Sequence, residues 1–217
     1  EGLYDPDEER RQINNILAKA RKTLNDLGGE NIANELIDVH SICTAQLAKI
    51  ESSDKRDEYS DLRALAHLLK CRHDVRTEIW TSAKESLEQA DPSKLAEDDK
   101  AMRDGLQLLI EDATSGPTKQ VAEMASSIRK LENWIEQTPD LFECRQIRAL
   151  AQRCLHQLVD AAWEDSAAAP TKSLSDSVLA IFAILDKDDS LRQAAAPFKD
   201  DWNWLPTYRK GRERKEP

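Results

Sequence analysis

The sequence predicts an all-α protein, and three observations favour this class. Gly and Pro are scarce, with 6 and 8 residues in a chain of 217, so the turn signals that separate strands are few. Ala, Leu, Glu, Lys, Arg and Gln, which favour helices, dominate the sequence. Apolar residues recur at spacings of three and four, which places them on one helical face. We expect two related three-helix units, packed as a helical bundle or short solenoid, with a C-terminal helical cap.

The first two helices follow from apolar spacing and from their ends. In the stretch 5–29, acidic residues stand where the helix begins and two glycines end it. A second helix is expected from about Glu30 to Ile50, and a polar stretch over residues 51–59 separates it from the next. Each shows one continuous apolar stripe. We therefore expect both to pack against a shared interior.

A third, long helix is expected from about Tyr59 to Leu87. Its apolar face is wide, as in a central helix that has neighbours on both sides. A narrow strip is expected to face water, and its members are Arg63, Lys70, Asp74, Thr77 and Glu78.

Three further helices complete the second unit. Asp91 and Pro92 predict the start of a helix that continues to about Ala113. A fifth helix is expected over residues 121–137. Residues 138–140, Thr-Pro-Asp, end it, and a sixth helix follows.

The sixth helix repeats a sequence motif of the third. Residues 63–80 and 148–163 both contain Arg-Ala-Leu-Ala, then Cys-x-His, then a Trp seven positions after that His. Duplication of a three-helix unit would explain this repeated motif. We expect a first unit at residues 1–90, a second at 91–167, capping helices at 168–200 and an aromatic and basic tail at 201–217.

The repeated Cys-x-His pattern raises the question of a zinc site. On one helix, Cys71 and His73 point about 200° apart and cannot share an ion. His73 and Trp80, and likewise His156 and Trp163, are instead predicted to stack as packing pairs. A zinc site built from separate helices, drawing in His40 and Cys43, stays open as an alternative. We assign no metal, cofactor or catalytic residue from the sequence.

Composition limits the classes of function. Phosphate-binding glycine loops and the common catalytic motifs are absent from the sequence, so a non-enzymatic protein is expected. The alternative is a metal-dependent or novel all-helical enzyme. The formal charge of −10 disfavours direct binding to nucleic acid. No apolar run is long enough to span a membrane. Four cysteines without a C-x-x-C pair predict a reducing intracellular compartment.

These limits favour a helical scaffold or adaptor that binds other proteins. The expected partner is a short hydrophobic or helical peptide held between helices. Self-association through an exposed helical edge is a further possibility. Because the first residue is not Met, we expect the chain to be part of a longer protein.

The tail offers the exposed candidates for partner binding. Its residues Trp202, Trp204, Leu205 and Tyr208 lie close together in the sequence, and aromatic residues are enriched in binding hot spots. They either anchor a partner or fold back onto their own domain. The basic run at residues 208–215 is either a nuclear targeting or phosphate-contacting segment, or a solvated chain end.

Residues 13–50 and 61–89, with the segments ELIDVHSI, LLKCRH and EIWTSAKESL, resemble the N-terminal helical domain of transcription elongation factor TFIIS and the related integrase-binding domain family. The resemblance covers under half of the chain. It implies a nuclear module that holds short disordered peptides of transcription regulators in a groove between helices. It therefore favours the nucleus over the cytoplasm, and it carries over no enzymatic residue.

Overall fold

The computed structural model describes residues 6–27, 33–115 and 121–164. All regular elements in these ranges are helical, which confirms the all-α class. The helices are α1 (Pro6–Asp26), α2 (Ala33–Ser52), α3 (Ser60–Arg76), α4 (Trp80–Gln89), α5 (Glu97–Ser115), α6 (Val121–Lys130), α7 (Glu132–Gln137) and α8 (Phe142–Glu164), with a 3₁₀ turn η1 (Pro92–Lys94) before α5. None of these helices is long and apolar enough to cross a membrane.

The chain divides into two compact units. Unit 1 contains Glu1–Gly116 together with Asp140–Arg145, and unit 2 contains Pro117–Pro139 and Gln146–Pro217. The first turn of α8 therefore belongs to unit 1, while the rest of α8 belongs to unit 2. The repeat and the boundaries expected at 1–90 and 91–167 stay predictions. The expected cap at 168–200 and the tail at 201–217 lie outside the described residues.

The interior of unit 1 is built from the apolar faces of α1, α2 and α3. Its residues on α1 recur every three or four positions, which fixes one buried stripe. The members of this cluster are Ile13, Leu17, Ala20, Leu24, Leu27, Leu36, Val39, Cys43, Ile50, Tyr59, Leu62, Ala66 and Leu69. The stripes expected from the sequence for the first two helices are thus the ones that the structure buries.

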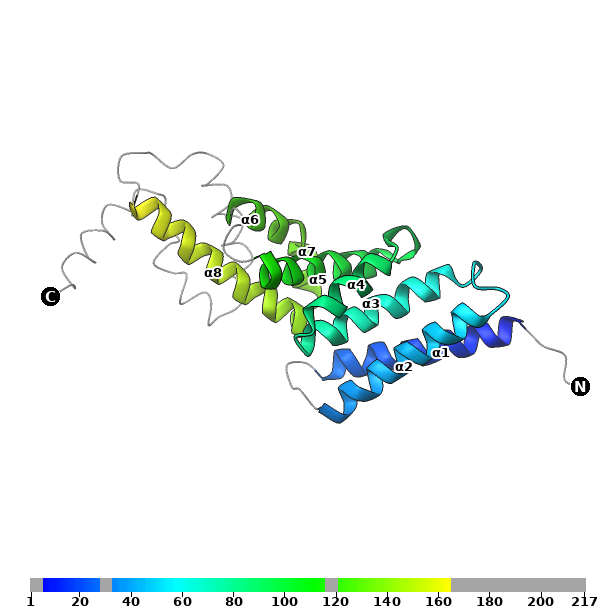
Figure 1. Cartoon of the computed structure of the whole chain (residues 1–217). Coiled ribbons are helices and arrows are strands. Elements are labelled where there is room, and N and C mark those ends of the chain that lie inside the picture. Colours follow the sequence, from blue (N-terminus) through cyan, green and yellow to red (C-terminus); the bar gives the residue numbers. More distant parts are fainter. Residues whose placement is uncertain (1–5, 28–32, 116–120, 165–217) are drawn as a thin grey trace, which may run out of the picture. The chain divides into compact units, whose positions relative to one another are not determined.

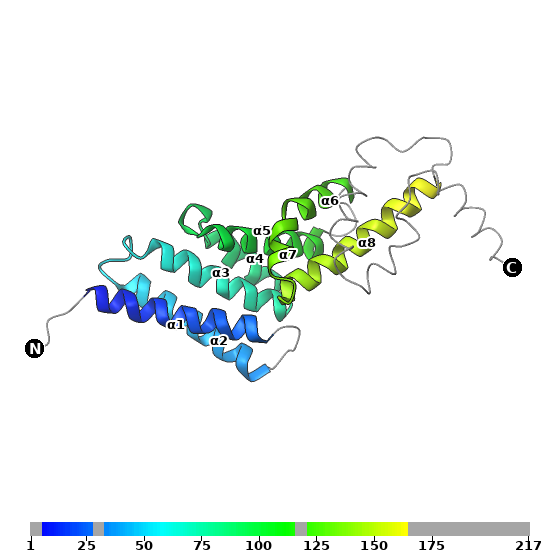
Figure 2. The ribbon, with the colours of Figure 1, turned by 180° about the vertical axis from the view of Figure 1, so that it is seen from behind.

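Helix α3 is the central helix of unit 1. It contacts α1 and α2 on one side and α4 and α5 on the other. Figures 1 and 2 show α3, in cyan, between the blue α1–α2 pair and the green α4 and α5. The wide apolar face predicted for this segment is explained by these four neighbours.

The single helix predicted from Tyr59 to Leu87 is wrong, because the chain turns after Arg76. Glu78 has a positive φ of 59°, the left-handed conformation that commonly ends helices. The Ile79 N–H then donates to the Asp74 carbonyl at 2.8 Å, and α4 begins at Trp80. Glycine is the usual residue in this conformation, so Glu78 gave no signal of the turn.

Two other expected helices also differ. Asp91 caps η1, where its carboxylate accepts a hydrogen bond from the Ser93 N–H at 2.9 Å, and α5 begins only at Glu97. The helix expected over 121–137 is divided at Leu131, where ψ is 0°. Nothing in the structure explains why the division falls there. The sixth helix was predicted correctly and corresponds to α8.

Unit 2 comprises α6, α7 and α8 after its first turn, in the part that the structure describes. Its buried apolar residues again recur at helical spacing on α6 and α8. They are Met124, Ile128, Leu131, Trp134, Ile135, Ile147, Leu150, Ala151 and Cys154.

Candidate functional site

The last six residues of α3 are buried, although four of them are polar or charged. These four are Arg72, His73, Asp74 and Arg76. Charged side chains are seldom fully buried unless they are paired. Each of the four has a partner, and the partners divide them into two networks on different faces of the helix.

The first network is a buried carboxylate held by two guanidinium groups. Arg72 donates to both carboxylate oxygens of Glu143, at 3.0 and 3.2 Å. The Nε of Arg76 donates to Glu143 at 3.4 Å, and its Nη2 donates to the Leu24 carbonyl at 2.7 Å. Arg72 also donates to the Asn25 side chain at 3.0 Å. These bonds join α3 to the end of α1 and to the first turn of α8.

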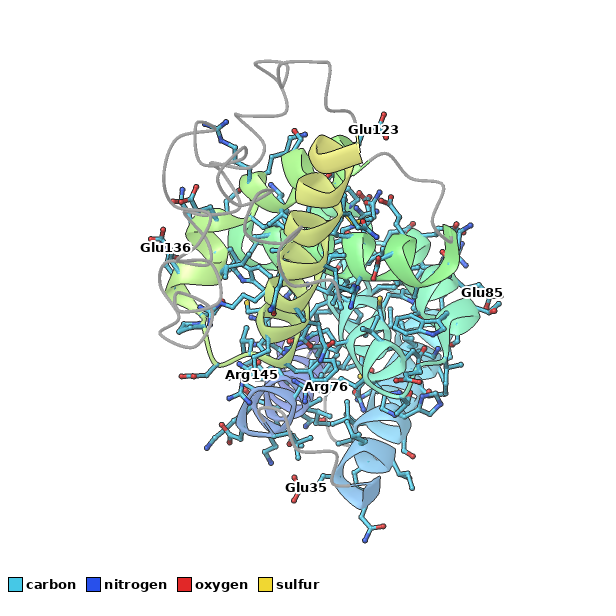
Figure 3. All side chains as sticks on the ribbon, turned by 90° about the vertical axis from the view of Figure 1, so that its left-hand side faces the viewer. Glu35, Arg76, Glu85, Glu123, Glu136 and Arg145 are labelled. Atoms are coloured by element: carbon cyan, nitrogen blue, oxygen red, sulfur yellow. The ribbon has the colours of Figure 1, made fainter. Side chains whose placement is uncertain are left out.

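Charge balance explains why these groups tolerate burial. Burial alone would raise the pKa of Glu143, but the charges of Arg72 and Arg76 outweigh it and hold this pKa below its ordinary value. The second positive charge meets the carbonyl end of α1, where the helix dipole is negative, and the ring of Phe142, whose centroid lies 4.9 Å from the Arg76 guanidinium. Figure 3 shows Arg76 in the interior, whereas Glu35 and Glu85 point outward. This network is structural, because bonds within unit 1 occupy its charged groups.

The second network is centred on Asp74, whose side chain is 1% exposed. Its Oδ2 accepts hydrogen bonds from Lys70 Nζ at 3.0 Å and from Ser82 Oγ at 2.7 Å. Its Oδ1 lies 2.8 Å from Nδ1 of His73. Lys70 also contacts Ser86 at 3.1 Å. The network therefore ties α3 to α4 across the turn at Glu78.

His40 brings α2 to the same carboxylate. The rings of His40 and His73 lie 5.0 Å apart, and His40 Nδ1 lies 3.8 Å from Asp74 Oδ1. The His40 side chain is 44% exposed, but its Nδ1 atom is buried and makes no hydrogen bond. One ligating atom from each of His40, His73 and Asp74 lies within 4.8 Å of the others. We call these three residues the His-His-Asp cluster.

Asp74 is ionised in this setting. Burial raises its pKa, but hydrogen bonds from His73, Ser82 and Lys70, together with the Lys70 charge, lower it further than burial raises it. The carboxylate therefore keeps its negative charge at neutral pH. Its Oδ2 is held by Lys70 and Ser82, so Oδ1 is the oxygen that faces the two imidazoles.

Two thiols close to this carboxylate are chemically inert. Burial, together with the charge of Asp74, raises the pKa of both Cys43 and Cys71 to about 12. A thiol with such a pKa is protonated at neutral pH, whereas a nucleophile or metal ligand must be a thiolate. The two cysteines therefore act as small apolar residues of the interior.

Two large apolar side chains that lie close in sequence to the His-His-Asp cluster are exposed, Ile37 and Ile79. Ile37 precedes His40 by three residues on α2, so both lie on one face of that helix. Ile79 follows α3 and donates its N–H to the Asp74 carbonyl. Ile37 is 60% exposed and Ile79 is 49% exposed, and Trp80 is partly exposed. We call Ile37, Ile79 and Trp80 the apolar edge.

The structure corrects two expectations for these residues. Asp74 was expected on a strip facing water, but it is buried because His73, Lys70 and Ser82 bind it. The stacked pair of His73 and Trp80 on one helix is also wrong, because α3 ends between them and His73 packs against His40. The sequence did contain one signal of this site, because His73 stands next to Asp74 and can donate a hydrogen bond to it. The prediction that Asp74 faces water did not use this signal.

The other predicted sites are not described. The side chains of His156 and Trp163, and the tail residues Trp202, Trp204, Leu205 and Tyr208, lie outside the described part of the chain. The zinc alternative named His40 and Cys43; the structure brings His40 to His73 and Asp74, and Cys43 is not a member of this group. Comparison of the chain with protein-family models, curated proteins and solved structures finds no match.

Proposed function

We propose that this chain is a non-enzymatic helical module for protein–protein interaction, which serves as a scaffold or adaptor within a larger intracellular assembly. The observation that carries the proposal is the apolar edge. A single exposed aliphatic residue is ordinary, but Ile37 precedes His40 by three residues and Ile79 follows the end of α3, so both lie close in sequence to the His-His-Asp cluster. Exposed apolar side chains that form one patch are typical of binding surfaces.

Rigidity of the α3–α4 turn, which carries Ile79 and leads into Trp80, supports this role. Asp74 holds the α3–α4 turn twice, because its carbonyl accepts from Ile79 and its carboxylate accepts from Ser82. The Lys70 side chain adds bonds to Asp74 and Ser86. A surface that is fixed before binding loses less conformational entropy when the partner arrives. The edge therefore suits recognition of a partner that orders on binding.

The chemistry of the buried groups also favours a binding role over catalysis. The Cys43 and Cys71 thiols, with pKa values of about 12, are poor nucleophiles. The buried carboxylate of Glu143 is occupied by two arginines. The charged groups of this network therefore stabilise the fold.

The partner that this surface would accept is a short apolar or amphipathic segment of another protein. Isoleucine and tryptophan side chains pack against apolar anchors spaced along a helix or an extended peptide. The net charge of −10 favours basic residues beside those anchors. The resemblance of residues 13–50 and 61–89 to TFIIS-like domains would place such a partner among nuclear transcription regulators.

A capture experiment with paired variants tests the proposal. The chain is immobilised, and proteins from a lysate are quantified by mass spectrometry on the wild type, on the double variant Ile37→Asp/Ile79→Asp and on the control Ala48→Asp. Ala48 is an exposed residue of α2, so the control adds the same kind of charge to the same helix. Circular dichroism checks that all three remain folded.

Proteins captured by the wild type and by Ala48→Asp, but lost from the double variant, are the expected result. Loss of one apolar anchor from an interface typically costs about 1–2 kcal/mol or more, so the double change should abolish capture. Failure of the wild type to enrich any protein, or equal capture by the double variant, would refute the role of the apolar edge.

A further inference from the structure

The His-His-Asp cluster has the chemistry of a divalent-cation site. Imidazole nitrogens and carboxylate oxygens are ligands that Zn²⁺ accepts, and three protein ligands with one open position form a common zinc arrangement. His40 comes from α2, whereas His73 and Asp74 come from the last turns of α3. A cation held by all three residues would join the two helices.

The distances from Asp74 are compatible with a shared ion, and all three ligand atoms lie within 4.8 Å of one another. Zinc lies about 2.0–2.2 Å from nitrogen and oxygen ligands, so ligand atoms at tetrahedral corners lie about 3.3 Å apart. Asp74 Oδ1 lies 2.8 Å from Nδ1 of His73 and 3.8 Å from Nδ1 of His40. The two separations bracket the tetrahedral value. Small rotations of the two rings would bring both nitrogens to it.

The buried nitrogen of His40 is the second, independent observation. Its Nδ1 faces the Asp74 carboxylate at 3.8 Å, which is too long for a hydrogen bond, and it has no other partner. Buried polar atoms without partners are rare in proteins. A cation between His40, His73 and Asp74 would satisfy this nitrogen. Each neutral imidazole would then carry its proton on Nε2 and bind the ion through Nδ1.

We propose that His40, His73 and Asp74 bind one Zn²⁺ ion or a similar divalent transition-metal ion. Lys70 and Ser82 hold the other oxygen of Asp74 and so fix the carboxylate in place, as outer partners of metal ligands commonly do. The site goes beyond the proposed binding function and does not depend on it.

The charge of Lys70 sets a limit on affinity. Its Nζ lies 3.0 Å from Asp74 Oδ2 and therefore repels a cation bound at Oδ1. Zinc should bind more weakly here than at a structural site with four protein ligands. The repulsion acts on Zn²⁺ and Mg²⁺ alike, but imidazole nitrogens suit Zn²⁺ and not Mg²⁺, so Zn²⁺ should bind better than Mg²⁺.

Calorimetric titration of the untagged chain with ZnCl₂ tests the proposal, and MgCl₂ serves as the comparison ion. The variants are His40→Ala and the control His67→Ala. His67 is a partly buried histidine of α3 outside the cluster, and its Nδ1 also lacks a hydrogen bond. Because His40 is 44% exposed, its removal should leave the fold intact. The visible spectrum with Co²⁺ gives a second readout, since tetrahedral cobalt absorbs strongly.

One Zn²⁺ per chain is expected, with affinity at least roughly tenfold lower in His40→Ala and unchanged in His67→Ala. Zinc should also raise the melting temperature of the wild type and not that of His40→Ala. The absence of zinc binding by the wild type, or equal affinity in His40→Ala, would overturn the proposal. The titration uses the chain alone, so its failure would not bear on capture of a protein partner.

Discussion

Glu143 is the residue on which the buried charges of unit 1 depend. It is fully buried and lies between Arg72 and Arg76. Removing one partner from a buried ion pair leaves an uncompensated charge, which costs about 3–5 kcal/mol. Two arginines share this one carboxylate, so protonation of Glu143 leaves Arg72 with the Asn25 amide and Arg76 with the Leu24 carbonyl and the Phe142 ring.

The lowered pKa of Glu143 makes stability sensitive to acid. Its folded pKa lies below the ordinary value of 4.5, so the stabilisation is complete above 4.5 and is lost as pH falls through the folded pKa. We expect the free energy of unfolding, measured by urea denaturation from pH 7 to pH 3, to fall below pH 4.5. One carboxyl contributes a slope of at most about 1.4 kcal/mol per pH unit.

Two variants assign this acid loss to Glu143. Glu143→Gln should start less stable at pH 7 and show a shallower acid slope, because its side chain does not titrate. Glu85→Gln, which removes an exposed carboxyl of α4, should keep the wild-type slope. A wild-type stability that stays constant down to pH 3 would contradict the ion-pair account.

At the scale of elements, the turn between α3 and α4 carries local strain. Glu78 is exposed and has φ of 59°, a conformation that costs a residue with a Cβ roughly 1–2 kcal/mol. Glycine adopts it without that cost. The turn nevertheless stays fixed, because Ile79 and Ser82 bind Asp74 on both sides of it.

Glu78→Gly should therefore stabilise the protein. Relief of strain exceeds the entropy that glycine adds to the unfolded chain, and we expect a gain of up to about 1 kcal/mol in the free energy of unfolding. The matched control is Glu85→Gly within α4, which should destabilise by about 1 kcal/mol. Urea denaturation measures both changes. A loss of stability in Glu78→Gly similar to that of the control would show that the turn is not strained.

Apolar spacing was sufficient to predict which segments are helical but not where each helix ends or how many helices there are. The buried stripes of α1 and α2 and the position of α8 follow from residues three or four apart. The break after Arg76 does not, because Ile79 and Trp80 continue an apolar pattern and the turn residue is Glu78. The apolar spacing therefore predicted one helix where the structure has α3 and α4.

The two polar networks could not be predicted for a related reason. Sequence patterns assign a charged residue on a helix to the solvent-exposed face. Its burial can be predicted only when the residue that pairs with it is known. For Arg72 that partner lies 71 residues away. For Asp74 one partner is the adjacent residue, but Ser82 reaches it only because the helix ends at Arg76.

At the scale of the whole molecule, unit 1 is discontinuous in sequence. Its main segment ends at Gly116, yet its buried arginines need the carboxylate from Asp140–Arg145. A chain cut after residue 116 would bury two guanidinium groups without their carboxylate. The charge balance in the interior of unit 1 thus depends on the short segment Asp140–Arg145, which is remote in sequence.

We expect a fragment ending at residue 116 to be less stable than one ending at residue 164 by about 3–5 kcal/mol. Thermal unfolding followed by circular dichroism measures the difference. Changing both Arg72 and Arg76 to Met should recover part of the loss in the short fragment and should destabilise the long one. Equal stability of the two fragments, or no recovery with Met, would contradict the requirement for Glu143.

The sequence separation of the buried ion pair also orders events during synthesis. Glu143 is added 71 residues after Arg72. At roughly 5–20 residues per second, the carboxylate follows the arginine by about 4–14 s. The synthesis of α3, α4 and α5 is completed during that interval, while both guanidinium groups still lack their counter-charge. A nascent chain therefore passes through a stage in which the main segment of unit 1, up to Gly116, is translated but its buried arginines are not yet neutralised, and the first turn of α8 ends that stage.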